Sequence, residues 1–113
     1  MTASANFVKP RDADWTPTEP GVRRRILTYN DQLMVVEVDF EKDAVGSLHR
    51  HPHIQASYVA EGSFEVTISG QSEILTKGQS FIVPTNEWHG CKALEKGMLI
   101  DTFTPMRAEF LAG

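Results

Sequence analysis

Residues 48–62 read LHRHPHIQASYVAEG, and this stretch contains three of the four histidines of the chain. In a β-strand, residues two apart point to the same side, so His49 and His51 can direct their imidazoles to one point. Pro52 cannot donate a ladder hydrogen bond and marks the end of that strand. The segment QASYVA then runs back antiparallel, which brings Gln55 beside the two histidines. A metal site, a proton relay and a His-rich polar turn are all compatible with this stretch.

The fourth histidine, His89, follows the turn signal PTNEW at the start of another predicted strand. Three imidazole nitrogens and one amide oxygen would then converge from three strands. A lone histidine is more often a surface polar group. A pair two apart on a strand, with a third beyond a turn, instead favours metal ligation, because imidazole binds zinc, nickel, iron and copper well.

Alternating apolar residues predict β-strands along most of the remaining chain. In LMVVEVDF (residues 33–40) every second side chain from Met34 to Phe40 is apolar, which is typical of a strand with one buried face. FEVTIS alternates in the same way, and EILT returns as its hairpin partner. Further strands are predicted for QSFIVP and GMLIDTF, whereas only MRAEFLAG can form a short helix. This pattern predicts a small all-β sandwich or barrel.

The chain of 113 residues suits a single domain. Residues 1–20 contain three of the six prolines and predict an extended N-terminal arm. The barrel would then occupy residues 21–113 and end in a short helical turn. Because Trp15 needs burial, we expect the arm to lie across the domain or across a neighbouring subunit, and we expect a homodimer.

Composition excludes several classes of partner. A net charge of −4 argues against nucleic acid, and no segment is long and apolar enough to span a membrane. The one dense basic run, Arg23 to Arg25, is interpreted as a solvated or salt-bridged strand end, with an anion or subunit contact as the alternative. The single cysteine, Cys91, cannot form an intramolecular disulfide, which fits a reducing compartment. Without an apolar leader segment, the expected location is the cytoplasm.

One group of residues resembles the first motif of the cupins, which are small jelly-roll (double-stranded β-helix) proteins. That motif places a glycine, two histidines one residue apart, a glutamate and a second glycine at set spacings. Here HRH, Gln55 and Gly62 match it, with glutamine in place of glutamate. Asp43 stands where the leading glycine is expected.

The second cupin motif is matched by Gly78, Pro84 and His89, with Asn86 in place of its second glycine. Asparagine tolerates the left-handed conformation that such a turn needs. The resemblance implies an all-β cupin jelly-roll and one divalent ion per chain, which could be zinc, nickel, iron, manganese or copper. It implies four metal ligands, His49, His51, Gln55 and His89. His53 has no ligand role in the pattern and is interpreted as a turn residue or as pocket lining.

HRHPHIQASYVAEG, VPTNEWHGC and LIDTFTPMRAEFL are similar to the small pectin-degradation cupins. This similarity implies metal-dependent conversion of 4,5-unsaturated uronates, the products of pectate and alginate lyases, to linear 5-keto-4-deoxyuronates. Asp101 would act as the acid/base. Arg107 would be a catalytic residue that also grips a small anionic sugar acid. Three aromatic residues, Phe103, Tyr58 and Trp88, would line the pocket.

Each of these roles has a structural alternative. Asp101 could pair with Arg107 at a strand end, and Arg107 could seat the C-terminal turn. The three aromatic residues could belong to the core. Cys91, two residues beyond His89, could be a soft ligand, although a small buried hydrophobe is the favoured interpretation. As a whole, the protein could instead be a cupin dioxygenase, another metal enzyme, or a non-catalytic sugar-acid-binding or metal-binding module.

Overall fold

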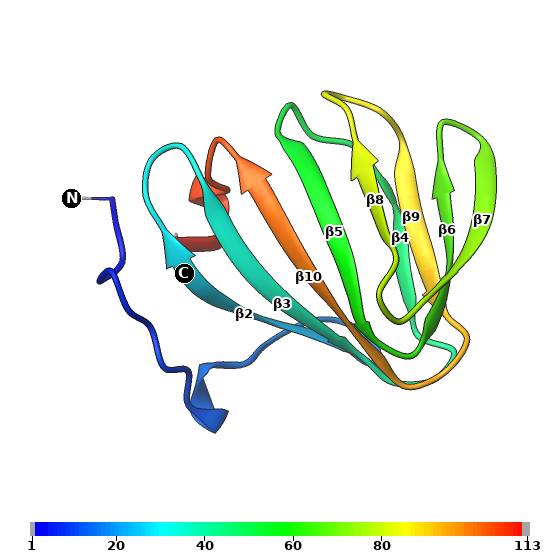
Figure 1. The fold of residues 1–113 in the computed structure, drawn as a ribbon, viewed down its shortest axis with the longest axis horizontal. Coiled ribbons are helices and arrows are strands. Elements are labelled where there is room, and N and C mark those ends of the chain that lie inside the picture. Colours follow the sequence, from blue (N-terminus) through cyan, green and yellow to red (C-terminus); the bar gives the residue numbers. More distant parts are fainter. Residues whose placement is uncertain (1, 112–113) are drawn as a thin grey trace.

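The computed structural model describes residues 2–111 and contains two β-sheets that curve toward each other (Figure 1). The larger sheet has the strand order β1-β2-β3-β10-β5-β8, and the smaller has the order β4-β9-β6-β7. The predicted all-β jelly-roll is confirmed. The strands are β1 (Thr16–Glu19), β2 (Val22–Tyr29), β3 (Met34–Phe40), β4 (Val45–His49), β5 (Ile54–Glu61), β6 (Ser63–Ile68), β7 (Gln71–Thr76), β8 (Ser80–Val83), β9 (His89–Ala93) and β10 (Gly97–Thr104).

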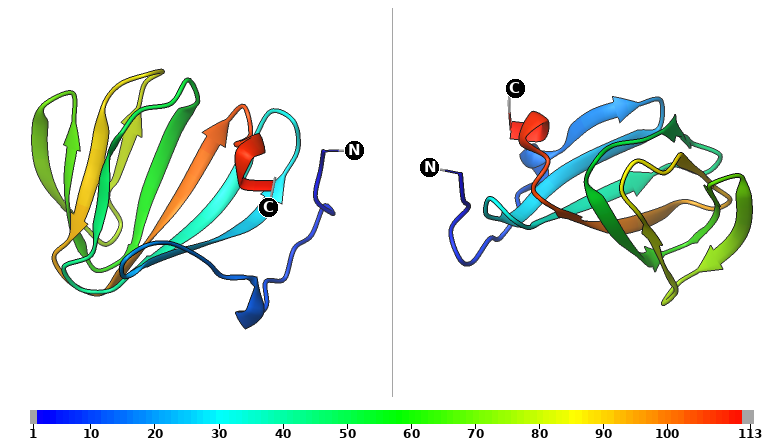
Figure 2. Two further views of the ribbon diagram at one scale, coloured as in Figure 1. Left: turned by 180° about the vertical axis from the view of Figure 1, so that it is seen from behind. Right: turned by 90° about the horizontal axis from the view of Figure 1, so that it is seen from above.

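The last strand, β10, lies between β3 and β5, so the C-terminal part of the chain passes through the middle of the larger sheet (Figures 1 and 2). β10 is antiparallel to both of these neighbours. The register places Asp101 opposite Val36 on one side and opposite Ser57 on the other. This pairing brings together residues that are far apart in the sequence.

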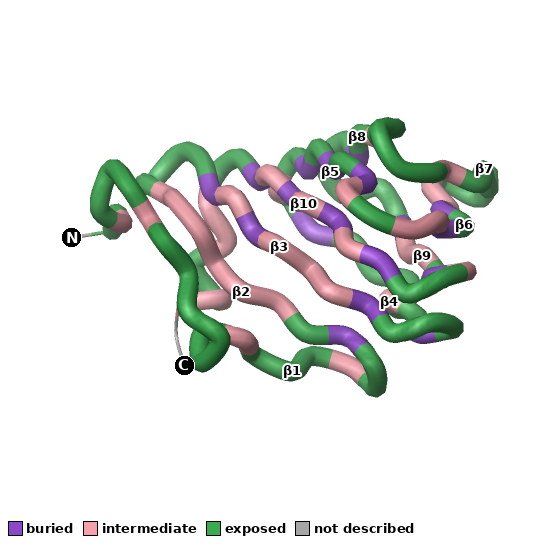
Figure 3. The backbone as a smooth tube through the Cα atoms, turned by 60° about the horizontal axis from the view of Figure 1, so that its bottom comes forward, coloured by how far each residue is buried: buried purple, intermediate pink, exposed green. Residues whose placement is uncertain are grey.

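Buried positions alternate with less buried ones along β5, β10 and the first part of β3, as the two-residue period of a strand requires (Figure 3). At one end of the larger sheet the inward side chains are apolar, including Phe40, Val59 and Leu99, which pack with Phe64 of the smaller sheet. Burying one such side chain contributes about 1.5–3 kcal/mol. At the other end the buried side chains include polar ones, His51, Gln55, Ser57, His89 and Asp101. The apolar end therefore holds the sheets together, and the polar end is available for chemistry.

The positions at which the cupin motifs have glycine adopt left-handed backbone conformations. Asn86 has φ of 61° and Asp43 has φ of 70°, so both residues that replace cupin glycines are in the left-handed region. Gly62 has φ of 79°, and a Cβ atom there would lie 2.6 Å from the carbonyl oxygen of Lys96. The substitutions by asparagine and aspartate are tolerated because short polar side chains reach this region at low cost.

The N-terminal arm contains two short elements of regular structure in addition to extended chain. Residues 12–14 form a short 3₁₀ helix, η1 (Asp12–Asp14), and β1 pairs antiparallel with β2 as an edge strand of the larger sheet. An edge strand tolerates Pro17 because one side of its backbone needs no partner. At the other end of the chain, a second 3₁₀ helix, η2 (Ala108–Leu111), forms the expected helical turn.

The basic run on β2 divides between the two faces of the larger sheet. Arg23 pairs with Asp39 at 2.9 Å, and Arg25 pairs with Glu37 at 2.7 Å. Both guanidinium groups also lie over the ring of Trp15, at 4.3 and 4.2 Å from its centroid. The salt-bridged interpretation therefore holds for these two arginines, and the arm packs on them through Trp15.

Within residues 2–111, no helix is long and apolar enough to cross a membrane.

Candidate metal centre

Three histidines meet at the polar end of the sheets. His49 ends β4 and His89 begins β9, and the two are directly opposite in the register of the smaller sheet. Their ring centroids are 4.3 Å apart, and the ring of His51 lies 4.8 Å from that of His89. One nitrogen from each ring can be chosen so that all three lie within 4.8 Å of one another. These three histidines could hold a metal ion.

Backbone carbonyls set the tautomer of each imidazole. A carbonyl oxygen only accepts hydrogen bonds, so an Nδ1 atom that faces one carries the proton, and the lone pair of a neutral ring is then on Nε2. All three rings have this contact, His49 with Ser47 O at 2.8 Å, His51 with His53 O at 3.0 Å and His89 with Glu87 O at 2.9 Å.

The charge state of the buried rings also suits metal binding. Burial is the main cause that lowers the pKa of His89 to about 4, and it also lowers the pKa of His51. Both rings are therefore neutral at pH 7. Among the described residues, the buried Nε2 of His89 has no hydrogen-bond partner. A buried lone pair without a hydrogen-bond partner at this place is consistent with a metal ligand.

A hydrogen-bonded chain orients the amide of Gln55. The hydroxyl of Ser57 donates to Asp101 Oδ1 at 2.6 Å, because a carboxylate can only accept. The Ser57 oxygen must then accept its other bond, which comes from Gln55 Nε2 at 2.9 Å. This leaves Gln55 Oε1 facing His51 Nε2 at 3.1 Å. Two lone pairs that face each other at this distance fit a cation between them, so Gln55 suits the role of a fourth ligand.

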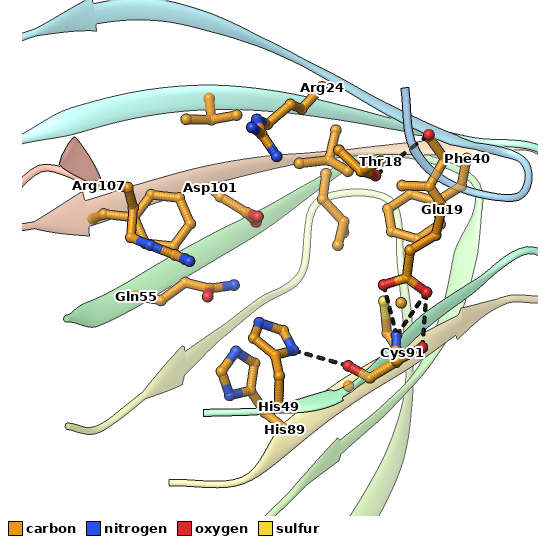
Figure 4. A pocket seen from close by; sticks show the side chains of 18 of the residues that line it. Thr18, Glu19, Arg24, Phe40, His49, Gln55, His89, Cys91, Asp101 and Arg107 are labelled. Carbon is orange, nitrogen blue, oxygen red and sulfur yellow. Dashed lines mark hydrogen bonds between the residues drawn. The ribbon is translucent and has the colours of Figure 1, made fainter. Parts of the chain in front are cut away.

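Beside the histidines lies a cavity of about 270 Å³ between the two sheets (Figure 4). Asp101, Phe103 and Arg107 line it, together with His49, His89 and Gln55. In addition to Phe103, the apolar part of its lining includes Val22, Val36, Val38, Phe40, Phe81, Leu99 and Phe110. Three of the four candidate ligands, His49, Gln55 and His89, thus share this cavity with Asp101 and Arg107, whereas His51 is not part of its lining.

Burial dominates the electrostatics of Asp101. It raises the pKa of this carboxyl to about 6, although the hydrogen bond from Ser57 and the charge of Arg107 both act to lower it. A carboxyl with a pKa near 6 can both accept and release a proton near neutral pH. Asp101 therefore has the ionisation behaviour of an acid/base.

Arg107 contacts the C-terminal turn and also lines the cavity. Its Nε donates to Glu109 at 2.6 Å, which holds the η2 turn, while the residue also lines the cavity. Its guanidinium lies over Phe103, at 5.0 Å from the ring centroid. Within residues 2–111 no ion pair joins Arg107 to Asp101, so the alternative of a structural Asp101–Arg107 pair is not found.

Two expected pocket residues lie elsewhere. Tyr58 is 48% exposed and points to the outer face of β5, because Gln55 and Ser57 on the same strand point inward. Trp88 is 51% exposed, and the guanidinium of Arg50 lies 5.0 Å from its ring centroid. Neither lines the cavity. The assignment of Tyr58 and Trp88 to the pocket wall is therefore corrected.

Cys91 and His53 also have defined places. Cys91 lines the cavity and packs against the apolar cluster of Phe40 and Phe64, and burial raises the pKa of its thiol to about 12. A protonated thiol is a poor ligand, so the interpretation as a small buried hydrophobe fits. His53 does not line the cavity, but its carbonyl oxygen holds His51.

Sequence reasoning did not place Glu19 or Ser57 at the site, and it did not distinguish Arg24 from the other two arginines of the basic run. Glu19 ends β1, lines the cavity and accepts hydrogen bonds from the backbone and hydroxyl of Ser47, the latter at 2.8 Å. It thereby joins the arm to β4. Ser57 lies two residues beyond Gln55, so strand alternation already placed it on the same face. Strand alternation also places Arg24 on the face of β2 opposite to that of Arg23 and Arg25.

We expect Ser57→Ala to weaken metal binding by about 10–100-fold, because outer partners of metal ligands have effects of that size. Without the hydroxyl, nothing fixes which end of the Gln55 amide faces the histidines. The measurement is the dissociation constant for zinc or nickel by competition with a chelator. Ser80→Ala, an exposed serine on the neighbouring β8, is the matched control and should bind metal normally. Equal metal affinity in both variants would contradict the orienting role.

Comparison with known proteins places this cavity in context. A family model described as Cupin domain matches residues 36–102. Over 102 residues, which are 88% of this chain and 93% of the relative, the sequence is 47% identical to the Pectin degradation protein KdgF of Dickeya dadantii (strain 3937). An RmlC-like cupin from Shewanella frigidimarina NCIMB 400 has a TM-score of 0.92 and 40% identity, covering 97% of this chain and 99% of that one. The structure of KdgF from Halomonas sp. has a TM-score of 0.88 and 38% identity, covering 95% and 99%.

Proposed function

This chain belongs to the cupin family and is close to the pectin-degradation cupins, and from that premise we propose that it converts 4,5-unsaturated uronates to linear 5-keto-4-deoxyuronates. The reaction opens the unsaturated ring and tautomerises the resulting enol, with one divalent ion bound per chain. One observation carries the proposal. The histidine cluster, a buried carboxyl with a raised pKa and a guanidinium all meet at one cavity.

The set of donor atoms suits a metal ion that acts as a Lewis acid on substrate oxygen atoms, without a redox step. The proposed ligands are His49, His51, His89 and the amide oxygen of Gln55, which are all neutral. They leave the full charge of a divalent ion uncompensated, so the centre attracts anions better than one with a carboxylate ligand would. Once bound, the ion would supply Lewis-acid polarisation of the substrate's oxygens.

Asp101 is proposed to move the protons. Ring opening takes the proton from the anomeric hydroxyl, breaks the bond between C1 and the ring oxygen, and leaves an aldehyde and an enol. Tautomerisation then removes the enol proton and adds a proton at C4, which leaves the ketone at C5. No oxidant, reductant or water is consumed. Ser57 occupies Oδ1 of Asp101, so Oδ2 is the atom proposed to exchange protons with the substrate.

Arg107 and Phe103 are proposed to hold the substrate. A guanidinium can bind a carboxylate through two parallel hydrogen bonds, which fixes orientation as well as position. The ring of Phe103 is 3% exposed and lies on the same face of β10 as Asp101. It would exclude water from the reacting carbon atoms and keep the pKa of Asp101 raised.

The direct test follows the absorbance of the 4,5-double bond in monouronates made by a lyase. Metal-loaded protein should remove this absorbance faster than the spontaneous reaction, and metal-stripped protein should not. Oxygen consumption during turnover would instead indicate a cupin dioxygenase. Saturable binding of the uronate without product would indicate a sugar-acid-binding module.

The assembly and location of the protein stay predictions. A homodimer is expected, as is a cytoplasmic protein with neither nucleic-acid nor membrane partners. None of the contacts described above depends on a second copy of the chain.

A further inference from the structure

Arg24 is the member of the basic run that faces inward. It lines the cavity, whereas Arg23 and Arg25 on either side form ion pairs on the opposite face of the sheet. Within residues 2–111, Arg24 has no ion pair and no side-chain hydrogen bond. Its guanidinium carbon lies 3.9 Å from the ring centroid of Phe110 in the η2 turn. A half-buried guanidinium whose only described contact is an aromatic ring retains its donors for a ligand.

A second guanidinium lies on the same ring. The Cζ of Arg107 is 4.4 Å from the Phe110 centroid, so the two guanidinium carbons are at most about twice that distance apart. Burial and, next, the charge of Arg107 lower the pKa of Arg24, which reports repulsion between the two cations. Of the nearby carboxylates, only Glu109 pairs with either of them, and it binds Nε of Arg107.

Arg24 lies apart from the histidines, whereas Arg107 is near enough that, besides burial, its charge lowers the pKa of His51 and of His89. In Figure 4, Arg24 lies on the side of the cavity opposite His49 and His89, and Asp101 and Arg107 lie between these two sides. An anion held by Arg24 would therefore be near Asp101 and within the same cavity as Arg107, without occupying the place of the metal. The phenyl ring holds both planar groups in position before a ligand arrives, which lowers the entropic cost of binding.

We propose that Arg24 and Arg107 form a carboxylate-binding subsite on Phe110, and that Arg24 makes the cavity selective for sugar acids over neutral sugars. This inference rests on the proposed function for its substrate class. In a 4,5-unsaturated uronate the carboxylate is attached to C5, so a carboxylate at this subsite brings the double bond toward Asp101. The ring oxygen and the anomeric hydroxyl are then the groups left to face the histidines.

The test uses Arg24→Gln, which removes the charge, and Arg24→Lys, which keeps the charge but cannot donate two parallel hydrogen bonds to a carboxylate. Arg23→Gln is the matched control, because Arg23 is the neighbouring arginine on the outward face. The binding probes are galacturonate, a saturated sugar acid that cannot react, and galactose, its neutral counterpart. Calorimetry on the metal-loaded proteins measures both affinities, and metal content is measured in parallel.

Wild-type protein and Arg23→Gln should bind galacturonate more tightly than galactose. Arg24→Gln should weaken galacturonate binding by about 10–100-fold, which is the size expected for a charge-assisted hydrogen bond, and leave galactose binding and metal content unchanged. The galacturonate affinity of Arg24→Lys should lie between those of the wild-type protein and Arg24→Gln. This second variant keeps the test valid if Arg24→Gln does not fold. With the unsaturated monouronate as substrate, Arg24→Gln should raise KM and leave kcat unchanged.

Unchanged galacturonate affinity in Arg24→Gln would overturn the subsite. So would a carboxylate preference that disappears on metal removal but not on substitution of Arg24, since the carboxylate would then bind at the metal. A wild-type protein that does not prefer sugar acids to neutral sugars would overturn it as well. If the unsaturated monouronate is bound in an Arg24-dependent way but not converted, the subsite stands and only the proposed reaction fails.

Discussion

Replacing both His51 and His89 by alanine is expected to abolish metal binding, whereas the wild-type protein should carry close to one divalent ion per chain. Each substitution removes a neutral imidazole whose Nδ1 is already held by a backbone carbonyl. One histidine and one amide then remain, which is too few donors to retain a structural or catalytic ion. Metal content is measured by elemental analysis after dialysis against a metal-free buffer.

The control for this experiment is His53→Ala. His53 belongs to the same histidine-rich stretch, but it contributes its backbone carbonyl rather than its ring, so this variant should keep its metal. Full occupancy in the His51→Ala/His89→Ala protein would place the ion elsewhere. A loss of metal in His53→Ala equal to that in the double variant would show that folding of the stretch, and not ligation, was measured.

Asp101→Asn is expected to lower turnover of the unsaturated monouronate by at least about 10²-fold, which is the usual contribution of a general acid/base. The substitution is nearly isosteric, and the asparagine oxygen can still accept the hydrogen bond of Ser57. Metal content should therefore stay near one ion per chain. Affinity for the uronate should hold or improve, because a negative charge has left the cavity. Rates are compared after subtraction of the spontaneous reaction.

The pH dependence of stability gives Asp101→Asn a second readout. In the folded metal-free protein the pKa of Asp101 is raised from 3.8 to about 6, so the folded state binds this proton more tightly than the unfolded state. Stability from this group is complete below pH 3.8 and is lost as the pH rises through 6. The full loss is on the order of 3 kcal/mol. At pH 8, metal-free Asp101→Asn should accordingly melt at or above the temperature of the wild-type protein.

Two outcomes would contradict this account of Asp101. Conversion by Asp101→Asn at nearly the wild-type rate would mean that another group carries the proton. Loss of the metal or of the fold in this variant would mean that the hydrogen-bonded chain from Asp101 through Ser57 to Gln55 has a structural role instead.

Much of the metal site could be predicted from the sequence because its geometry is local. His49 and Gln55 are each placed by the two-residue period of a strand, and His89 is placed by the turn before it. That turn needs a left-handed residue, and Asn86 is one of the few non-glycine residues that reach this conformation readily. The error over Tyr58 was avoidable, since the alternation that turns Gln55 inward turns Tyr58 outward.

The sequence by itself thus determined the all-β class through strand alternation, and its two separate motifs carried the resemblance to the cupin family and to its histidine cluster. Only the tertiary structure placed Arg24 and Phe110 in the same cavity as Asp101. Arg24, Asp101 and Phe110 come from β2, β10 and η2, and they meet because β10 lies between β3 and β5 and the following turn lies over the inner face of β2. Strand order of this kind is set by long-range packing of the two sheets, which no local periodicity records.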